Sequence, residues 1–123
     1  MEYSKAVLSR FRHPHHAGRP DLPADKLVSG RAGKRRTGSD VVFYLQIIAN
    51  EIRDARFEAY GCPHTIAVAE YMAGQLIGRP ADRAMQETPQ QVADQLGLPA
   101  EKLGQALIVE DAISAALGEW EKQ

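Results

Sequence analysis

The chain of 123 residues is long enough to bury one hydrophobic core without disulfides or a structural metal, and we expect a single domain over residues 1–123. Its 44% hydrophobic and 25% charged residues are typical of a globular protein and exclude wholesale disorder. The formal net charge of −1 gives no general attraction to nucleic acid or to a membrane surface. No segment predicts a signal peptide or a membrane span, and a single cysteine favours a reducing, cytoplasmic location.

The first third of the chain predicts a short helix followed by an irregular connection. A helix is expected from Ser4, a suitable N-cap, to Phe11, because apolar residues recur at helical spacing. Pro14 ends it, since the residue before a proline avoids helical geometry. Leu27–Arg31 predicts a strand, which Gly30 weakens. Three histidines surround the proline, and their composition is more typical of a solvated loop than of a metal site: His13, His15 and His16.

The middle of the chain predicts an antiparallel hairpin. Val41–Ala49 is rich in β-branched and aromatic residues, and both of its faces are apolar at its start, so we expect the central strand of a sheet here. Asn50–Glu51 predicts the turn, and Ile52–Tyr60 alternates in polarity as a half-buried partner strand does. With the preceding strand, these segments form a small three-stranded antiparallel sheet.

The rest of the chain predicts helices. Thr88 and Gln91 have the spacing of a capping box, with a proline at the first helical position. Strands first and helices after them indicate an α+β fold, with the helices packed on one face of the sheet. The expected helices cover residues 62–77, a short segment after Pro80, residues 88–96 and residues 101–120.

Cys62 lies where the strand pattern changes to the helical pattern. Gly61 supplies a permissive backbone at this junction, and Pro63 suits the first turn of a helix. A thiol at a helix N-terminus is favoured as the thiolate by unpaired N–H groups and by the helix dipole. Two interpretations follow: a reactive or metal-binding sulfur, or a small apolar residue that fills the junction.

Three stretches of the chain carry a family resemblance. They are YSKAVLSRFRHPHHAG at the start, DARFEAYGCPHTIA around the cysteine, and LGLPAEKLGQALIVEDAISAAL over the last expected helix. In this order they resemble segments of the iron–sulfur cluster scaffold family that includes IscU and the N-terminal domain of NifU. The resemblance covers almost the full length. It implies iron–sulfur cluster assembly by a non-enzymatic scaffold or carrier, with a cysteine desulfurase or other assembly proteins as partners.

The chain departs from the family at two of the three cysteines on which the cluster is built. Cys62 matches the second. The first belongs to a C-G-D-V motif that here reads T-G-S-D-V, so Gly38 or Thr37 occupies its position, depending on the alignment. The aspartate of this motif is kept as Asp40. The third cysteine follows a histidine in the family, and Gly104–Gln105 stands in place of that pair.

The resemblance therefore predicts Cys62 and Asp40 as cluster ligands, with His64 as a third ligand for a single metal ion. Such a mixed set could hold Fe²⁺ or Zn²⁺ weakly, with water completing the shell, and binding of no metal at all is an open alternative. Iron–sulfur clusters are held mainly by thiolates, usually four, so a cluster would have to be shared between two chains of a homodimer.

We expect a divergent family member that keeps the partner-binding surface and accepts sulfur on Cys62 from a cysteine desulfurase. The alternative is an interaction module without metal, or a regulatory decoy that occupies such a partner. The basic run Lys34–Arg36, together with Arg31, could bind an acidic partner or a phosphate, although such runs are more typical of exposed loops. No catalytic triad, phosphate loop or base-reading motif is present, so we expect neither an enzyme nor a nucleic-acid-binding protein.

Overall fold

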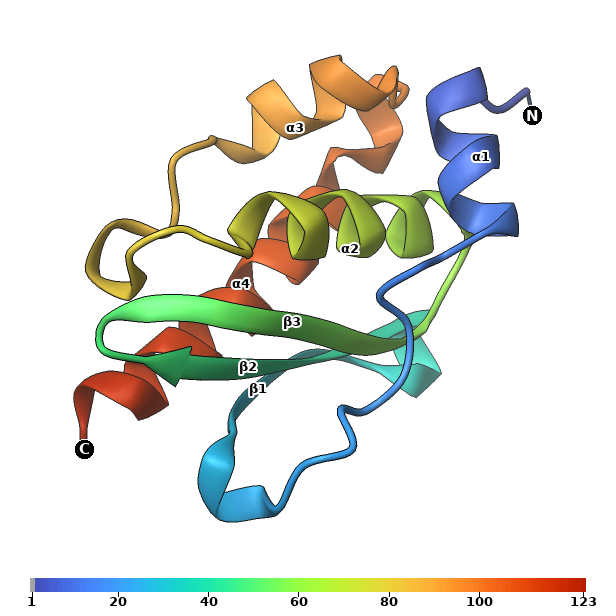
Figure 1. Cartoon of the computed structure of the whole chain (residues 1–123). Helices are drawn as coiled ribbons and strands as arrows, with labels where there is room; N and C mark the ends of the chain where they lie inside the picture. Colours follow the sequence, from blue (N-terminus) through green and yellow to red (C-terminus); the bar gives the residue numbers. More distant parts are fainter. Residues whose placement is uncertain (1) are drawn as a thin grey trace.

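The computed structural model describes residues 2–123, which fold into helices packed against a three-stranded sheet (Figure 1). The helices are α1 (Lys5–Arg12), α2 (Pro63–Leu76), α3 (Pro89–Leu96) and α4 (Leu103–Glu121), and the strands are β1 (Val28–Lys34), β2 (Ser39–Ile48) and β3 (Glu51–Tyr60). Short 3₁₀ turns occupy Ala24–Lys26, Arg35–Thr37, Ala81–Arg83 and Ala100–Lys102. The expected α+β fold, with helices on one face of an antiparallel sheet, is confirmed.

β2 is the central strand, as predicted, and pairs antiparallel with β1 and with β3. Its buried side chains Val41, Phe43 and Leu45 face the helices, and their period of two residues fixes the register of the sheet. Val42 and Tyr44 lie on the outer face and are only half-buried. The apolar residues on both faces of β2 therefore correctly predicted its central position. They did not mean that a second layer of helices covers the outer face.

The β2–β3 turn is shifted by one residue from its predicted place. Ala49 and Asn50 form it, with φ values of 51° and 62°. Two successive left-handed residues are what a two-residue type I′ hairpin requires, because this turn matches the twist of the flanking strands. The prediction of Asn50–Glu51 was wrong by one position, since Glu51 already belongs to β3.

α4 crosses the inner face of β1 at Gly30, where the two backbones touch. A Cβ atom at this residue would lie 2.2 Å from the nitrogen of Ala116 and 2.3 Å from the carbonyl oxygen of Ala112. Glycine is therefore a packing requirement here. α2 packs on the same face over β3, so the two long helices sandwich the core against the sheet (Figure 1). The buried apolar side chains form one continuous cluster.

The helix boundaries follow local signals that the sequence predicts. Thr88 Oγ1 accepts a hydrogen bond from the backbone N–H of Gln91, and the Gln91 side chain accepts one from the N–H of Thr88, which confirms the capping box. Ser4 caps α1 by accepting from the N–H of Val7. None of the helices within residues 2–123 is both long enough and apolar enough to cross a membrane.

His16 ties the connection between α1 and β1 to α2. Its backbone N–H donates to Glu70 Oε1 (2.7 Å), and its ring Nδ1 lies 2.5 Å from Glu70 Oε2. Glu70 is only 6% exposed, so its carboxylate needs such partners. His13 and His15 are exposed as expected. The expectation of a solvated loop was wrong for His16, because nothing local in the sequence indicates a contact with a residue 54 positions away.

The two edges of the sheet differ. Along β3, Phe57 exchanges two backbone hydrogen bonds with residues 16–18, and Ile52 exchanges two with residues 78–79. The edge of β3 is thus covered by chain segments at both ends. Along β1, the backbone makes no hydrogen bond to any strand other than β2 within residues 2–123.

A second acid with restricted access to water, the half-buried Glu110, lies on α4. Its Oε2 atom is shielded from water and finds no hydrogen-bond partner among residues 2–123. Burial, with the nearby carboxylates of Glu87 and Asp111, raises the pKa of Glu110 to about 7. Its charged form is therefore disfavoured in the folded protein.

Candidate functional site

Cys62 is the N-cap of α2 and is partly exposed at the end of β3. Its carbonyl oxygen accepts the first hydrogen bond of the helix, from the N–H of Ile66. A Cβ atom at Gly61 would lie 2.5 Å from Oγ1 of Thr65, so only glycine lets the chain fold back this closely over the first helical turn. The strand-to-helix junction predicted from the sequence is confirmed.

The surroundings of Cys62 favour its thiolate. Partial burial by itself raises the pKa of the thiol. Hydrogen bonds from the backbone N–H and the hydroxyl of Thr65 and from the backbone N–H of His64, together with the positive charge of Lys102, outweigh burial and hold the pKa below the ordinary value of 9.0. A partly exposed thiol with a depressed pKa is the form in which cysteine acts as a nucleophile or a metal ligand.

A hydrogen-bonded network links the thiol to β2 and α4. Gln105 Oε1 accepts from the hydroxyl of Ser39 (2.7 Å) and from the hydroxyl of Thr65 (2.6 Å). Thr65 Oγ1 in turn lies 3.6 Å from Cys62 Sγ, so its single hydroxyl proton is given either to Gln105 or to the thiolate. Ser39 and Thr65 are 5% and 0% exposed, whereas Cys62 and Gln105 are half-buried, so the two hydroxyls of the network are shielded from water. The pole of the molecule at which β2, α2 and α4 converge thus carries one thiol, two hydroxyls and one amide.

His64 lies beside the thiol but is fully buried. Its Nδ1 is 3.8 Å from Cys62 Sγ, its ring packs on Tyr3, and its Nε2 has no hydrogen-bond partner among residues 2–123. Burial and the charge of Lys102 lower its pKa, against a smaller opposing effect of Glu101. The imidazole is therefore neutral at physiological pH.

Asp40 is bound by an arginine. Arg31 Nε and Nη2 contact its two carboxylate oxygens at 2.8 and 2.5 Å, and Arg35 Nε lies 3.9 Å away. Gly33 stands opposite Asp40 in the sheet, so no side chain blocks the reach of Arg31 along β1. The hydrogen bonds from Arg31 hold the pKa of Asp40 below its usual range despite burial.

The structure therefore pairs Cys62 with His64 but does not add Asp40 to them as a third ligand. Within residues 2–123, no three His, Cys, Asp or Glu side chains lie close enough together to hold a metal ion. The physical reason at Asp40 is its bidentate ion pair, which uses both oxygens.

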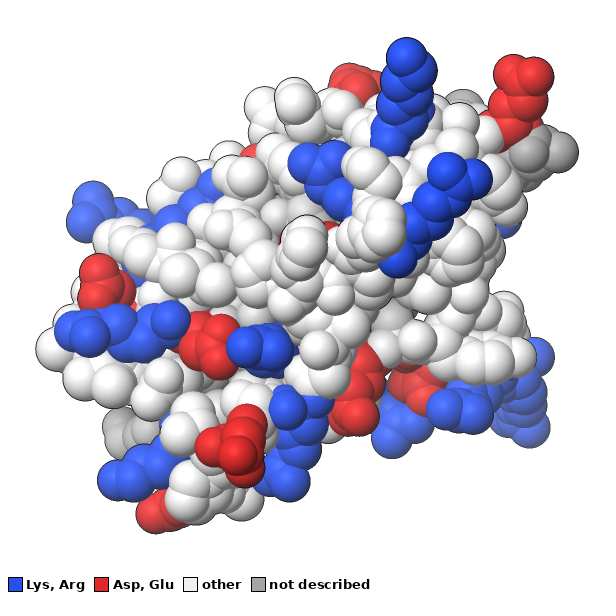
Figure 2. All heavy atoms as spheres, turned by 45° about the vertical axis from the view of Figure 1, so that its right-hand side comes forward, with Lys and Arg blue, Asp and Glu red and all other residues white. Residues whose placement is uncertain are grey.

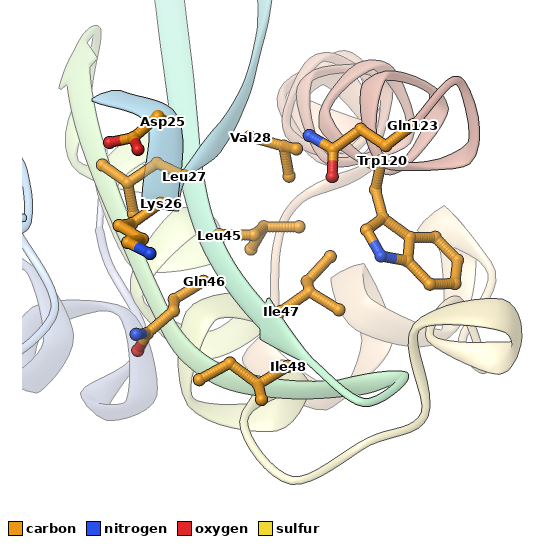
Figure 3. A pocket seen from close by; sticks show the side chains of 10 residues that line it. All are labelled: Asp25, Lys26, Leu27, Val28, Leu45, Gln46, Ile47, Ile48, Trp120 and Gln123. Atoms are coloured by element: carbon orange, nitrogen blue, oxygen red, sulfur yellow. The ribbon is translucent and has the colours of Figure 1, made fainter. Parts of the chain in front are cut away.

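A hollow of about 370 Å³ lies at the opposite end of β2 (Figure 3). Figure 3 shows Val28, Leu45 and Ile47 on the side of the strand that faces Trp120 and Gln123, and Asp25, Lys26, Leu27 and Gln46 on its other side. No thiol or histidine lines it. This hollow is separate from the pole that carries Cys62.

Comparison with known proteins identifies the family. The family model described as the NifU-like N-terminal domain matches residues 2–123. The chain belongs to this family. It is 32% identical over 126 residues to the iron–sulfur cluster assembly scaffold protein IscU of Escherichia coli (strain K12), a match that covers all of this chain and 97% of the relative. IscU of Azotobacter vinelandii is also 32% identical, over 98% of this chain and 94% of its own length.

A solved structure of this family shares the fold. The N-terminal part of a NifU-like protein from Brucella abortus superimposes with a TM-score of 0.75 at 20% identity, over 97% of this chain and 94% of that one. Within the NifU-like N-terminal domain family, this chain is thus ordinary in architecture. Its pole at Cys62 carries Ser39, Thr65 and Gln105 beside a single cysteine.

Sequence reasoning missed two residues of that pole in this NifU-like domain. Gln105 was identified at the position of the third cysteine, but neither Ser39 nor Thr65 was. For Ser39, the available signal was strand alternation, which turns residue 39 towards the same face as Val41. For Thr65, the signal was its place in the first turn of α2, three residues after Cys62.

Proposed function

We propose that this protein works in iron–sulfur cluster assembly as a scaffold or carrier, and that Cys62 is the residue that accepts sulfur. The single observation that carries this proposal is a partly exposed thiol of lowered pKa at the N-terminus of α2. The full-length match to the family, and the cluster assembly role named for its IscU relatives, support it. A metal-free interaction module or decoy has no support among these relatives.

Sulfur transfer to Cys62 needs only the groups at this pole. The Cys62 thiolate attacks the outer sulfur of a persulfide carried by a cysteine desulfurase. A new S–S bond forms on Cys62, the original S–S bond breaks, and the desulfurase cysteine leaves as a thiolate. No further oxidant or reductant is required. The N–H groups of His64 and Thr65 that stabilise the thiolate are placed to stabilise the anionic persulfide as well.

A complete cluster does not fit the donors of one chain. Clusters are held mainly by thiolates, whereas Ser39 and Gln105 present oxygen and nitrogen at this pole. The cluster is therefore cargo, held by Cys62 of one chain with ligands supplied by a second copy or by a partner protein. For a single Fe²⁺ or Zn²⁺ ion we keep Cys62, Asp40 and His64 as the proposed ligands, with two conditions: Asp40 exchanges Arg31 for the metal, and the three side chains, which are not close enough together in this structure, move towards one another.

The setting of this function follows from the same chemistry. We propose a cytoplasmic location, where a lone thiol stays reduced. We further propose that the protein acts as a scaffold or carrier without an enzymatic activity of its own, and that a cysteine desulfurase is its sulfur-donating partner.

Anaerobic reconstitution tests the proposal. The protein is incubated with Fe²⁺, sulfide and a thiol, or with a cysteine desulfurase and cysteine, and its visible spectrum, its metal content and the mass of the Cys62 peptide are recorded. In the wild type we expect added sulfur on Cys62 after incubation with the desulfurase and cysteine, and a coloured, iron-containing product after incubation with Fe²⁺, sulfide and a thiol; we expect neither in Cys62→Ser. Ser114→Ala, an exposed change on α4, serves as the control and should behave as the wild type. A product without colour, metal or added sulfur would refute the proposal.

A further inference from the structure

Four cationic side chains gather at the turn between β1 and β2: Arg31, Lys34, Arg35 and Arg36, here called the basic patch. The patch lies at the same end of the sheet as the thiol. Asp40, the carboxylate that Arg31 holds, pairs across the sheet with Tyr60, two residues before Cys62. Arg35 stacks over the ring of Tyr60 at 4.8 Å.

The charge of the basic patch is not balanced locally. Four arginines elsewhere stand beside acids, in the pairs Arg53–Glu51, Arg56–Asp54, Arg79–Glu87 and Arg83–Asp82, whereas those that form no ion pair within residues 2–123 (Arg10, Arg12 and Arg19) are not grouped at one turn. On the face drawn in Figure 2, some Lys and Arg side chains adjoin Asp or Glu, and others, in the upper part of the view, have mainly uncharged neighbours. The basic patch has only Asp40 for its four cations, and Lys34 and Arg36 form no ion pair within residues 2–123. A protein with a net charge of −1 thus concentrates positive charge beside its thiol.

The two arginines of the patch that face the sheet are held in place yet remain accessible. Arg31 is fixed by its two contacts to Asp40, and Arg35 by Tyr60, but their side chains are 66% and 73% exposed. Groups ordered before binding lose less entropy when a partner arrives. Arginine and tyrosine are also the side chains enriched in protein interfaces, and a guanidinium matches a carboxylate in geometry.

A hollow of about 330 Å³ opens on the outer face of the sheet between these side chains. Arg31, Arg35, Tyr44 and Tyr60 contribute to its wall. Glu58 also lines the hollow, and its carboxylate accepts a hydrogen bond from the Tyr44 hydroxyl. Arg19 stacks on the Tyr44 ring (5.9 Å), and its positive charge offsets the negative charge of Glu58. Asp40 lines the hollow as well, but Arg31 binds both of its oxygens, so the hollow presents guanidinium groups and aromatic rings beside two carboxylates that already have partners.

We propose that the basic patch is a docking surface for an acidic segment of a partner protein, which it brings next to Cys62. Asp40 and Tyr60 act as positioning residues that hold Arg31 and Arg35 for this contact. Charge complementarity selects the occupant, since the patch offers guanidinium forks at close spacing and no extended basic track of the kind that follows a phosphate backbone. The identity of the partner rests on the proposed function, but the binding of an acidic segment does not.

Fluorescence anisotropy with a labelled glutamate-rich peptide of about ten residues tests this surface without iron or sulfur. We expect the wild type to bind it, and the double variant Arg35→Ala/Arg36→Ala to lose about tenfold or more in affinity. Arg83→Ala is the matched control, because Arg83 is similarly exposed (79%) and lies near the far end of the β2–β3 hairpin. Binding should also weaken as NaCl rises from about 50 to about 300 mM.

Three outcomes would overturn the inference: no binding of the peptide, equal affinity in the double variant, or tighter binding of a duplex DNA of similar charge. A bound acidic peptide should also slow the alkylation of Cys62 by iodoacetamide, which reports that the contact is adjacent to the thiol. Peptide binding with no sulfur on Cys62 would refute the proposed function alone. Normal sulfur loading without peptide binding would refute the docking surface alone.

Discussion

Replacement of Glu110 by glutamine is expected to stabilise the protein at neutral and alkaline pH. Burial and the nearby carboxylates of Glu87 and Asp111 raise the pKa of Glu110 from 4.5 to about 7. Unfolding restores the ordinary value, so the unfolded chain loses this proton at lower pH than the folded protein does. The folded state is consequently favoured below pH 4.5, and that advantage is lost as the pH rises towards about 7.

The size of the effect follows from the same two values. The gap between 4.5 and about 7 corresponds to at most about 3.4 kcal/mol, at 1.36 kcal/mol per pKa unit. Glu110 as a whole is only half-buried, so solvent screens part of this electrostatic free energy. The destabilisation that remains is about 1–2 kcal/mol. A neutral amide at this position escapes the penalty of the buried charge. We therefore expect Glu110→Gln to gain about 1–2 kcal/mol at pH 8 and close to nothing at pH 4.5.

Urea unfolding of the wild type and of Glu110→Gln, measured at intervals between pH 4.5 and pH 8, provides the test. Glu119→Gln, an exposed substitution on the same helix, is the control and should change the unfolding free energy by less than about 0.5 kcal/mol at any pH. The reasoning fails if the difference between wild type and Glu110→Gln is independent of pH, or if glutamine destabilises the protein at pH 8.

Three further substitutions probe the site and the packing around it. Thr65→Val removes a hydroxyl hydrogen bond to the thiol, so the pH midpoint of Cys62 alkylation should move upward; an unchanged midpoint would exclude that role. Gly30→Ala forces a Cβ atom into the backbone of α4 and should lower the free energy of unfolding in urea by more than about 2 kcal/mol. Its control is Gly118→Ala, which has open space around the new Cβ atom and should stabilise α4. Glu70→Ala removes the anchor of the α1–β1 connection and should cost about 1–3 kcal/mol and speed proteolysis there; equal cleavage rates would contradict this anchor.

The fold was predictable because its determinants are local. Alternation of apolar residues indicated β2 and β3, helical spacing and a capping box at Thr88 indicated the helices, and the change of period located Cys62 at the junction. The function of Gly30 was not predictable in the same way. A glycine is unfavourable within a strand when only its neighbours in the sequence are considered. The close approach of α4, which lies more than 80 residues later, explains why glycine is needed at this position.

Of the residues at the candidate site, only the position of Cys62 was predictable from the sequence pattern. Cys62 was identified from its position, but the state of Asp40 depends on Arg31, which reaches it across the sheet. Gln105 was placed by resemblance, yet its hydrogen bond with Ser39 joins residues 66 positions apart. Strand register and helix packing create such contacts, and a single sequence does not encode them in any short pattern.

The open edge of β1 has a consequence for the behaviour of the protein in solution. Because chain segments cover both ends of the β3 edge, β1 is the edge that remains open to a second molecule within residues 2–123, and a single open edge allows a closed pair rather than a filament. Two such edges brought together would place Arg31 and Lys34 of one molecule close to the same cations of another. Like-charge repulsion thus opposes this pairing at low salt, and neutralisation of these two side chains would be expected to favour a dimer joined along β1.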